Sequence, residues 1–490
     1  MKLRPIFKDI SLTFIASAIT LVGFIFIYRL IGRNFGPEGV GEYSLIRRVI
    51  GFLQPLVLLG LCLGLPRYIA MSKDENQRIS YMKVGSLIIV IFTIFFLLVI
   101  NLLRNHFAKA FFGNVNYANL VLPFSFLLAG SVLHFLVYAY FRGRLFAKTF
   151  NFLQVINLFL VPIIILIFFK NIGISKIISL IGITTFIIAF IFSLSFVRDF
   201  FTPVKKLQLK NSLKELFCYS LPRVPGDFAY AGLFSLGPIF AAHFTSIQEV
   251  GYLSVSQSLV LGTCGIIAPL DVILLPKISL LIAQGEQEKI KKNLDLFIAA
   301  IFQCSIFICV QLIIFTDTII KYWLGSEFFG AVPVMRVVIF SIIFYAFYVA
   351  MSSILDATKV KPINTINTFI SLFLFLLIAW IFLFPFKFFI PIISLGIAFS
   401  SALCCLAVLT YFSLRKIYSG SQKKDLSHLM IAILTNLLLA GIAISTKPFI
   451  TSKFYYLIIF EIFLGIVYLS ILWLLKMDWL RQIPGKILLR

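Results

Sequence analysis

Apolar runs about as long as a membrane span recur along the whole chain, and short polar segments separate them. A helix needs roughly 20 apolar residues to cross the hydrocarbon core of a bilayer. Runs of that length predict about fourteen transmembrane helices. Their expected ranges are 10–32, 43–70, 84–103, 120–141, 151–169, 177–197, 217–241, 251–282, 296–320, 335–356, 364–385, 390–413, 428–446 and 454–475. We therefore expect an all-α integral membrane protein.

The composition agrees with this interpretation and narrows the function. Of the 490 residues, 61% are hydrophobic and 13% are charged, which is more apolar surface than a soluble domain can bury. The net charge of +24 could indicate a nucleic-acid partner, but the basic residues lie between apolar runs and form no basic module. We expect no nucleic acid. The 7 cysteines include no CxxC pair and the 4 histidines have no ligand spacing, so we expect no metal site.

Basic residues between the expected spans are concentrated in alternate segments. The segment from Lys73 to Lys83 and the segment 198–216 are basic, whereas the segments on the opposite side hold few basic residues, such as Arg33 and Lys170. Positively charged loops stay in the cytoplasm. We therefore expect a multi-pass protein of the cytoplasmic (inner) membrane with both termini in the cytoplasm.

Short motifs recur at one constant offset along the chain. Val40-Gly41-x-x-Ser44 reappears as Val250-Gly251-x-x-Ser254, and Leu65-Pro66-Arg67 reappears as Leu275-Pro276-Lys277. An even number of expected spans separates the paired positions, so the two copies have the same orientation in the membrane. A parallel repeat of this kind places the working cavity between two lobes and favours alternating access.

The repeat divides the chain into four parts. They are an N-lobe of six spans at 1–197, a basic cytoplasmic linker at 198–216, a C-lobe of six spans at 217–413, and two further spans with a cytoplasmic tail at 414–490. Because the linker mixes basic and apolar residues, we expect it to lie along the lipid headgroups.

Basic residues inside expected spans are the main candidates for a binding site, because a cation at mid-bilayer costs roughly 2.5–3.5 kcal/mol. Such residues normally face a wet cavity or an anionic partner. The candidates for substrate binding are Arg29, Arg47, Arg48, Arg67, Arg223 and Lys277. Arg67 and Lys277 lie near helix ends, where their side chains could instead reach the headgroups. Guanidinium groups suit phosphate and diphosphate, so these cations predict an anionic cargo.

The segment from Leu221 to Asp227 contains two prolines and a glycine, which predict a break near the start of the seventh span. Arg223 and Asp227 stand one turn apart, and they could either neutralise each other or form a hinge that carries a cation. Asp227 and Asp271 are the candidate ion-coupling residues, although Asp271 could also pair with Lys277. We expect no cofactor other than a coupling H⁺ or Na⁺.

Three motifs resemble those of a known family. Arg33-x-x-Gly36-Pro37-Glu38-Gly39-Val40-Gly41-x-Tyr43 resembles the signature of the polysaccharide biosynthesis (O-antigen, oligosaccharide) flippases. Gly64-Leu65-Pro66-Arg67-Tyr68 and Leu221-Pro222-Arg223-Val224-Pro225-Gly226-Asp227 are similar to motifs of that family. The family belongs to the multidrug/oligosaccharidyl-lipid/polysaccharide (MOP) exporter superfamily. The likeness covers most of the chain.

The resemblance implies two six-helix lobes followed by two further helices. It also implies a polyprenyl-diphosphate-linked oligosaccharide as cargo, moved from the cytoplasmic to the outer leaflet for O-antigen, capsule or exopolysaccharide assembly. Arg67 and Arg223 match basic positions of the family motifs, whereas Arg47 and Arg48 rest on the insertion cost alone. Partners would be membrane lipid and the lipid-linked glycan, and could include a polysaccharide polymerase and chain-length proteins.

Two other functions remain open at this point. An ion-coupled multidrug or cation antiporter of the same superfamily would need carboxylates in the first lobe, and the first six expected spans contain none. A membrane-embedded polysaccharide polymerase would need a catalytic carboxylate or a basic loop outside the membrane, and the expected outer loops are short. We therefore expect a transporter and not an enzyme.

Overall fold

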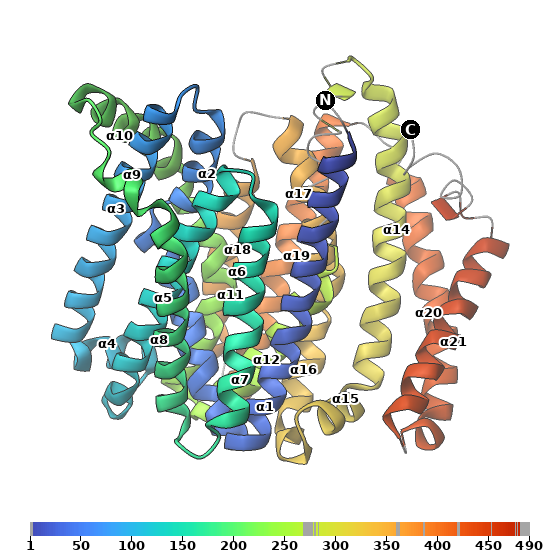
Figure 1. Ribbon diagram of the computed structural model, residues 1–490. Helices are drawn as coiled ribbons and strands as arrows, with labels where there is room; N and C mark the ends of the chain where they lie inside the picture. The colour runs from blue at the N-terminus through green and yellow to red at the C-terminus, as the bar shows by residue number, and fades with distance from the viewer. Residues whose placement is uncertain are drawn as a thin grey trace. The chain divides into compact units, whose positions relative to one another are not determined.

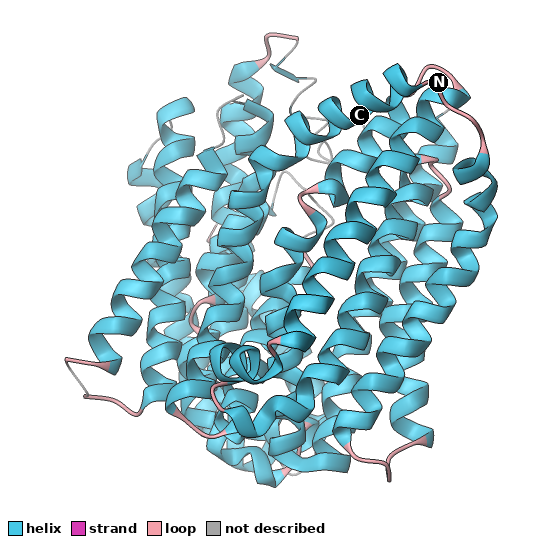
Figure 2. Ribbon diagram, turned by 90° about the vertical axis from the view of Figure 1, so that its left-hand side faces the viewer, coloured by secondary structure: helices cyan, strands magenta, loops and turns pink. Residues whose placement is uncertain are grey.

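The computed structural model describes residues 3–267, 278, 281–282, 284–358, 363–385, 388–418, 422–451, 453–475, 477 and 479–480. Across these ranges the chain is helical with short connections and contains no strand (Figure 2). The expected all-α class is confirmed. The chain forms two compact units, unit 1 from Met1 to Val255 and unit 2 from Ser256 to Arg490, and each is described by itself.

Unit 1 contains the elements before Val255 (Figure 1). They are α1 (Leu3–Leu58), α2 (Leu61–Met71), α3 (Glu75–Leu102), α4 (Arg104–Phe112), η1 (Val115–Leu120), α5 (Val121–Gly143), α6 (Ala147–Val155), η2 (Ile156–Leu160), α7 (Val161–Phe168), α8 (Ile174–Ser193), η3 (Leu194–Phe196), α9 (Val197–Phe201), α10 (Lys206–Ser220), η4 (Leu221–Arg223) and α11 (Val224–Phe244). Helix α12 (Ile247–Gly265) begins in unit 1 and ends in unit 2. Helix α1 packs against α6 and α11, while α5 packs against α2, α3 and α8.

The first two expected spans form one interrupted helix. Gly36 breaks α1 with a φ of 64° and a ψ of −168°, a conformation that is costly for a residue with a Cβ. The second expected span does not run unbroken to residue 70, because α1 ends at Leu58 and α2 begins only after Gly60, whose φ is 69°.

Unit 2 contains a second helical bundle. Its elements are α14 (Gln287–Ile314), α15 (Thr316–Trp323), η5 (Ser326–Ala331), α16 (Val332–Ile339), α17 (Ile342–Thr358), α18 (Ile363–Leu383), α19 (Pro391–Ile417), α20 (Gln422–Ile450) and α21 (Phe454–Leu474). Helix α19 packs against α16, α17 and α18, and α14 packs against α17 and α20. Phe347, Phe375 and Phe399 are fully buried in this bundle.

Ten helices among the described residues are long and apolar enough to cross a membrane, or 11 if the bent pair Ser326–Ile339 and Ile342–Asp356 forms one span. This confirms a multi-pass membrane protein. Helix α1 counts as one of the ten, although it covers two expected spans. Helices α11 and α12, where two further spans are expected, are not among the ten. The expected number of about fourteen stays a prediction.

The first pair of repeated motifs lies in contact within unit 1. A Cβ added to Gly41 would lie 1.9 Å from the Ile247 carbonyl oxygen, and one added to Gly251 would lie 3.0 Å from the Gly41 nitrogen. The motif serines Ser44 and Ser254 are both fully buried. The Val-Gly motif and its copy therefore meet backbone to backbone.

Candidate functional site

Helix α2 lies against its neighbours through glycines. A Cβ on Gly64 would lie 2.1 Å from Ser220 Oγ, and a Cβ on Gly60 would lie 2.5 Å from the Ser220 carbonyl oxygen. On another side of α2, a Cβ on Gly143 would lie 2.7 Å from Ile69 Cβ. Because none of these glycines has a side chain, α2 can approach α10 and α5 closely.

The helix is interrupted between α10 and α11, as the two prolines predict. Helix α10 ends at Ser220, the 3₁₀ turn η4 covers Leu221–Arg223, and α11 starts at Val224. Pro222 and Pro225 lack the N–H groups that a continuous helix would need at this point. The break places Arg223 just after the helix that carries Tyr219.

Two predicted cations meet on the Tyr219 ring. The guanidinium carbon of Arg67 lies 4.4 Å from the ring centroid, and that of Arg223 lies 3.7 Å from it. Arg223 Nη1 also donates a hydrogen bond of 2.6 Å to the Tyr219 carbonyl oxygen. The Tyr68 ring packs edge-on against Tyr219 with centroids 5.7 Å apart. Cation–π contacts of this kind hold guanidinium groups without neutralising them.

No carboxylate among the described residues forms an ion pair with Arg67 or Arg223, and both arginines are exposed. Asp227 lies one turn along α11 and is half-buried, yet it forms no ion pair with Arg223 in this part of unit 1. No direct ion pair joins the two side chains here, although the Arg223 charge still acts on Asp227, and both interpretations of this pair stay predictions. We call Arg67, Tyr219 and Arg223 the arginine–tyrosine site.

The other predicted cations are not part of this site. Arg47 lies over the Phe24 ring with its guanidinium carbon 4.9 Å from the centroid. Arg48 donates a hydrogen bond of 3.2 Å to the Ser254 carbonyl oxygen, and Arg29 is half-buried on the same helix, α1. Lys277 and Asp271 lie outside the described residues.

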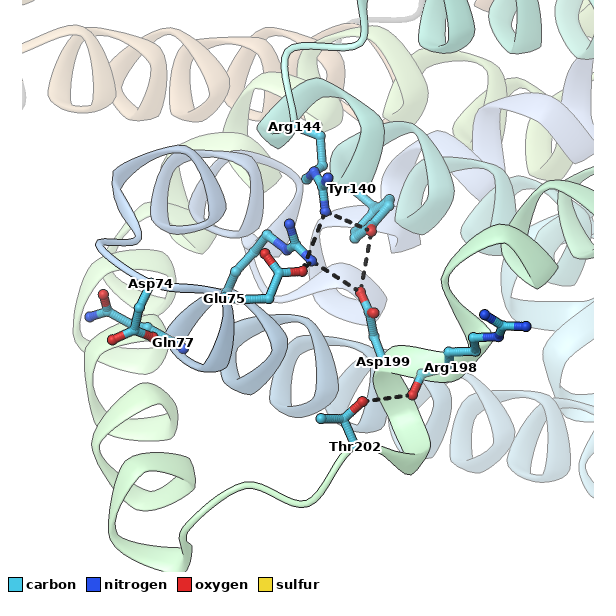
Figure 3. Close-up of polar contacts among 9 residues, drawn as sticks. Asp74, Glu75, Gln77, Tyr140, Arg144, Arg198, Asp199 and Thr202 are labelled. Carbon is cyan, nitrogen blue, oxygen red and sulfur yellow. Dashed lines mark hydrogen bonds and ion pairs between the residues drawn. The ribbon is translucent and has the colours of Figure 1, made fainter.

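A second group of charges near α10 was not predicted from the sequence (Figure 3). Arg78 forms an ion pair with Glu75 and lies 3.8 Å from an Asp199 carboxylate oxygen. Arg144 lies 3.9 Å from Glu75, and the Tyr140 hydroxyl donates to Asp199 over 3.2 Å. We call these five residues the ionic cluster. Only the Glu75–Arg78 pair, three residues apart, could have been noticed in the sequence.

The ionic cluster belongs to a larger set of contacts that hold the linker on α3. The Lys83 ammonium donates to the Thr202 carbonyl oxygen, and the hydroxyls of Ser80 and Ser212 lie 2.8 Å apart. Leu207 of the linker is 70% exposed. The linker therefore has one face packed on protein and one face open to its surroundings.

A cavity of about 760 Å³ lies within unit 2, between α14, α17, α19 and α20. Its lining is almost entirely apolar and includes Phe302, Phe344, Tyr411 and Ile433. None of the predicted cations that the structure describes lines this cavity. The described residues contain no cluster of three or more His, Cys, Asp or Glu that could hold a metal ion.

Comparisons with known proteins agree with this architecture. A family described as "Polysaccharide biosynthesis protein" matches residues 6–282. The fold is similar to that of the lipid II flippase MurJ in an inward closed conformation, at 15% identity and a TM-score of 0.71 over 94% of this chain and 98% of that chain. It is also similar to an inward-facing multidrug resistance MATE family transporter of the MOP superfamily, at 14% identity and a TM-score of 0.67 over 82% and 95% of the two chains.

A third structure of similar fold is a MOP superfamily transporter from Pyrococcus furiosus, at 15% identity and a TM-score of 0.57 over 84% of this chain and 97% of that chain. No curated protein sequence matches the chain. At these identities the likeness to solved structures concerns the fold.

Proposed function

Because the chain belongs to the polysaccharide biosynthesis protein family, we propose that it is a flippase for a polyprenyl-diphosphate-linked oligosaccharide. It would move this cargo from the cytoplasmic to the outer leaflet of the inner membrane for O-antigen, capsule or exopolysaccharide assembly. The similarity in fold to a lipid II flippase supports a lipid-linked cargo. In this proposal the chain is a transporter and catalyses no covalent reaction.

The observation that carries the proposal is the pair Arg67 and Arg223, which share one ring and have no carboxylate partner among the described residues. Two like charges held close together repel each other unless an anion comes between them. Guanidinium groups present paired donors that match phosphate oxygens. A diphosphate carries negative charge on two neighbouring groups and therefore suits this pair.

The rest of the cargo has two different requirements. Sugars and diphosphate need a polar path, whereas the polyprenyl chain can stay in hydrocarbon. We propose that the lobes alternate access to a cationic cavity that also contains Arg29, Arg47, Arg48 and Lys277, with Asp227 and Asp271 as ion-coupling residues.

The apolar cavity of about 760 Å³ in unit 2 has a lining suited to an isoprenoid segment. An interior-negative potential favours outward movement of an anion by about 2.3 kcal/mol per charge per 100 mV.

The test uses cells that lack this protein and express single variants. Arg67→Ala and Arg223→Ala should each reduce the lipid-linked glycan that reaches the outer leaflet by about tenfold or more, because each removes a charge-assisted contact. The matched control is Arg104→Ala, an exposed arginine at the start of α4. Normal transport by both site variants, at normal protein levels, would refute the proposal.

An ion-coupled multidrug or cation antiporter is the second candidate, because the fold is also similar to that of a multidrug resistance transporter. A cationic drug would be repelled by Arg67 and Arg223. Export of such drugs by cells that express this chain, without any effect on lipid-linked glycan, would favour the antiporter.

A further inference from the structure

Helix α21 carries a carboxyl group well inside a membrane span. Glu461 lies roughly 10 Å from the first residue of α21, at a rise of 1.5 Å per residue. Its neighbours Ile462 and Phe463 are 60% and 58% exposed, as expected for side chains that face lipid. One oxygen of the Glu461 carboxyl is buried and has no hydrogen-bond partner among the described residues. The Glu461 side chain as a whole is half-buried, and this oxygen is shielded by protein.

A buried amide without partners lies on the facing helix. Gln311 of α14 is 4% exposed, and neither its side-chain oxygen nor its side-chain nitrogen has a hydrogen-bond partner in the described structure. An isolated buried amide is costly, because it loses its hydrogen bonds to water and gains none. Gln311 therefore needs a partner that can both donate and accept.

Aromatic contacts set the register between α14 and α21. The Phe315 and Phe460 rings lie 6.3 Å apart, and the Phe307 and Tyr468 rings lie 4.8 Å apart, so the two helices run antiparallel. Gln311 lies midway along α14 between Phe307 and Phe315. Glu461 directly follows Phe460 on α21. Their levels along the helices therefore differ by about one turn or less.

The other polar groups near this place are already engaged or lie elsewhere. On α20, Lys447 pairs with Asp317 of α15 at 2.7 Å, and His428 lies near the other end of the helix. On α21, the Tyr468 hydroxyl donates to the Gln303 carbonyl oxygen over 3.0 Å. On α14 the nearest titratable side chain is Cys309, which is buried and donates to the Ile339 carbonyl oxygen over 3.6 Å, and Cys304 further along the helix is exposed. No cation among these groups neutralises a Glu461 carboxylate.

The remaining surroundings are apolar. Leu439, Ala443, Leu457 and Leu464 form the buried cluster between α14, α20 and α21. An ionised carboxylate in such surroundings is expensive, so the acid form is favoured at rest. A neutral carboxyl can donate to an amide oxygen, and an ionised one can accept from an amide nitrogen. The structure has no hydrogen bond between Gln311 and the buried Glu461 oxygen, but the flexible side chains of both residues could meet by changing rotamer, and Gln311 would then satisfy either protonation state.

We propose that Glu461 and Gln311 form a proton-binding site in unit 2, outside the predicted repeat. The Glu461 carboxylate takes up one H⁺ to become the neutral acid and later releases the same H⁺. A metal cation would need more oxygen ligands than these two side chains supply. A role of this proton exchange in driving transport rests on the proposed function. In that role Glu461 would be a coupling residue in addition to Asp227 and Asp271.

A hydrophobic carbodiimide tests the site directly, because this reagent modifies protonated carboxyl groups in apolar surroundings. The full-length protein in lipid nanodiscs is treated over a series of buffers from acidic to alkaline, and adducts are located by mass spectrometry. We expect an adduct on Glu461 whose yield falls as the pH rises, and no adduct at that position in Glu461→Gln. An unmodified Glu461 in folded protein, or a yield that does not change with pH, would overturn the proposal.

The role of Gln311 has its own test. In Gln311→Leu the carboxylate loses its donor, so half-maximal labelling of Glu461 should occur at about tenfold lower H⁺ concentration. Gln257→Leu is the matched control, because Gln257 is also fully buried with both amide atoms unpartnered. An equal shift in both variants, or none in Gln311→Leu, would remove Gln311 from the site.

Coupling is tested separately from proton binding. In cells, Glu461→Gln should lower transport of lipid-linked glycan when a pH gradient is the driving force. Normal transport by this variant, together with pH-dependent labelling of the unmodified protein, would overturn the coupling and keep the proton site. A failure of the proposed function would look different, since the unmodified protein itself would then move no glycan.

Discussion

Two sets of arginines lie close together in unit 1, and their surroundings differ in one respect. In the ionic cluster, Arg78 and Arg144 contact Glu75. In the arginine–tyrosine site, Arg67 and Arg223 contact an aromatic ring and no carboxylate among the described residues. The Tyr68 and Tyr81 rings, 5.1 Å apart, connect the two regions through α2 and α3.

The difference teaches how to separate structural from functional charge. An arginine that contacts carboxylates completes its electrostatic balance within the fold, and its removal should change stability. An arginine held by a ring keeps its charge available, because the ring's quadrupole neutralises nothing. Removing an arginine of the first kind should lower thermal stability. Removing one of the second kind should lower transport of the cargo.

The largest expected effect comes from giving the arginine–tyrosine site a carboxylate. Tyr219→Glu would neutralise Arg67 and Arg223 internally and make the site resemble the ionic cluster. We expect transport of lipid-linked glycan to fall by about 100-fold, because two charge-assisted contacts are lost. Tyr219→Phe keeps the ring and should transport normally. Equal activity of the two variants would contradict this comparison.

A smaller effect should follow from moving α2 away from α10. In Gly64→Ala the new Cβ would lie 2.1 Å from Ser220 Oγ and would push Arg67 away from Tyr219. We expect transport to fall and stability to drop by about 1–3 kcal/mol, measured by thermal unfolding.

Ser220→Ala provides the control for this variant. It removes the clashing oxygen, and the Gly64 Cβ position lies 3.5 Å from Ser220 Cβ, an ordinary contact. The double variant Gly64→Ala/Ser220→Ala should therefore regain both transport and stability. If it does not, the contact between α2 and α10 is not what positions Arg67.

The ionic cluster should respond in stability and much less in transport. Arg78→Ala leaves the largely buried Asp199 without its ion-pair partner, whereas Glu75 keeps Arg144, and the loss at Asp199 should destabilise unit 1 by about 1–3 kcal/mol. Thermal unfolding in detergent measures this loss, and transport is compared per folded molecule. Arg198→Ala is the control, since its side chain is exposed. A transport defect in Arg78→Ala without a stability defect would reverse the roles assigned to the two regions.

The smallest effect concerns a paired charge in unit 2. Burial favours the neutral form of Asp317, but the hydrogen bond and charge of Lys447 outweigh it, so the pKa of Asp317 lies below its ordinary value. A lowered carboxyl pKa stabilises the fold above the unfolded value of about 4 and ceases to do so as the pH falls through the folded value. Asp317→Asn should cost about 0.5 kcal/mol at neutral pH. Melting curves of the two proteins should converge in acid, and a constant difference would contradict this assignment.

The sequence predicted the spans well wherever local hydrophobicity decides the structure. The range 454–475 matches α21 (Phe454–Leu474), and 364–385 matches α18 (Ile363–Leu383) within two residues. The break at Pro222 was also predictable, because it depends on a missing N–H group in the segment itself. These features need no information from distant parts of the chain.

Other features depend on contacts between distant residues and could not be predicted. The end of α1 at Leu58 coincides with positive φ angles at Leu59 and Gly60, and the missing side chain of Gly60 lets the chain lie on Ser220. Arg67 and Arg223 were identified as candidates by their positions inside expected spans and by the family motifs, but nothing in their spacing places both on Tyr219. The ionic cluster was missed because Glu75 and Asp199 approach only after folding.

The contact between Gly41 and Gly251 has a consequence for how the first motif and its copy can change. Neither residue has a side chain that could change its rotamer to accommodate a small shift of the backbone. Any side chain added at either glycine would therefore have to push the two backbones apart. A substitution of one glycine therefore disturbs the backbone of the other copy directly. We expect the two glycines to be lost together or not at all.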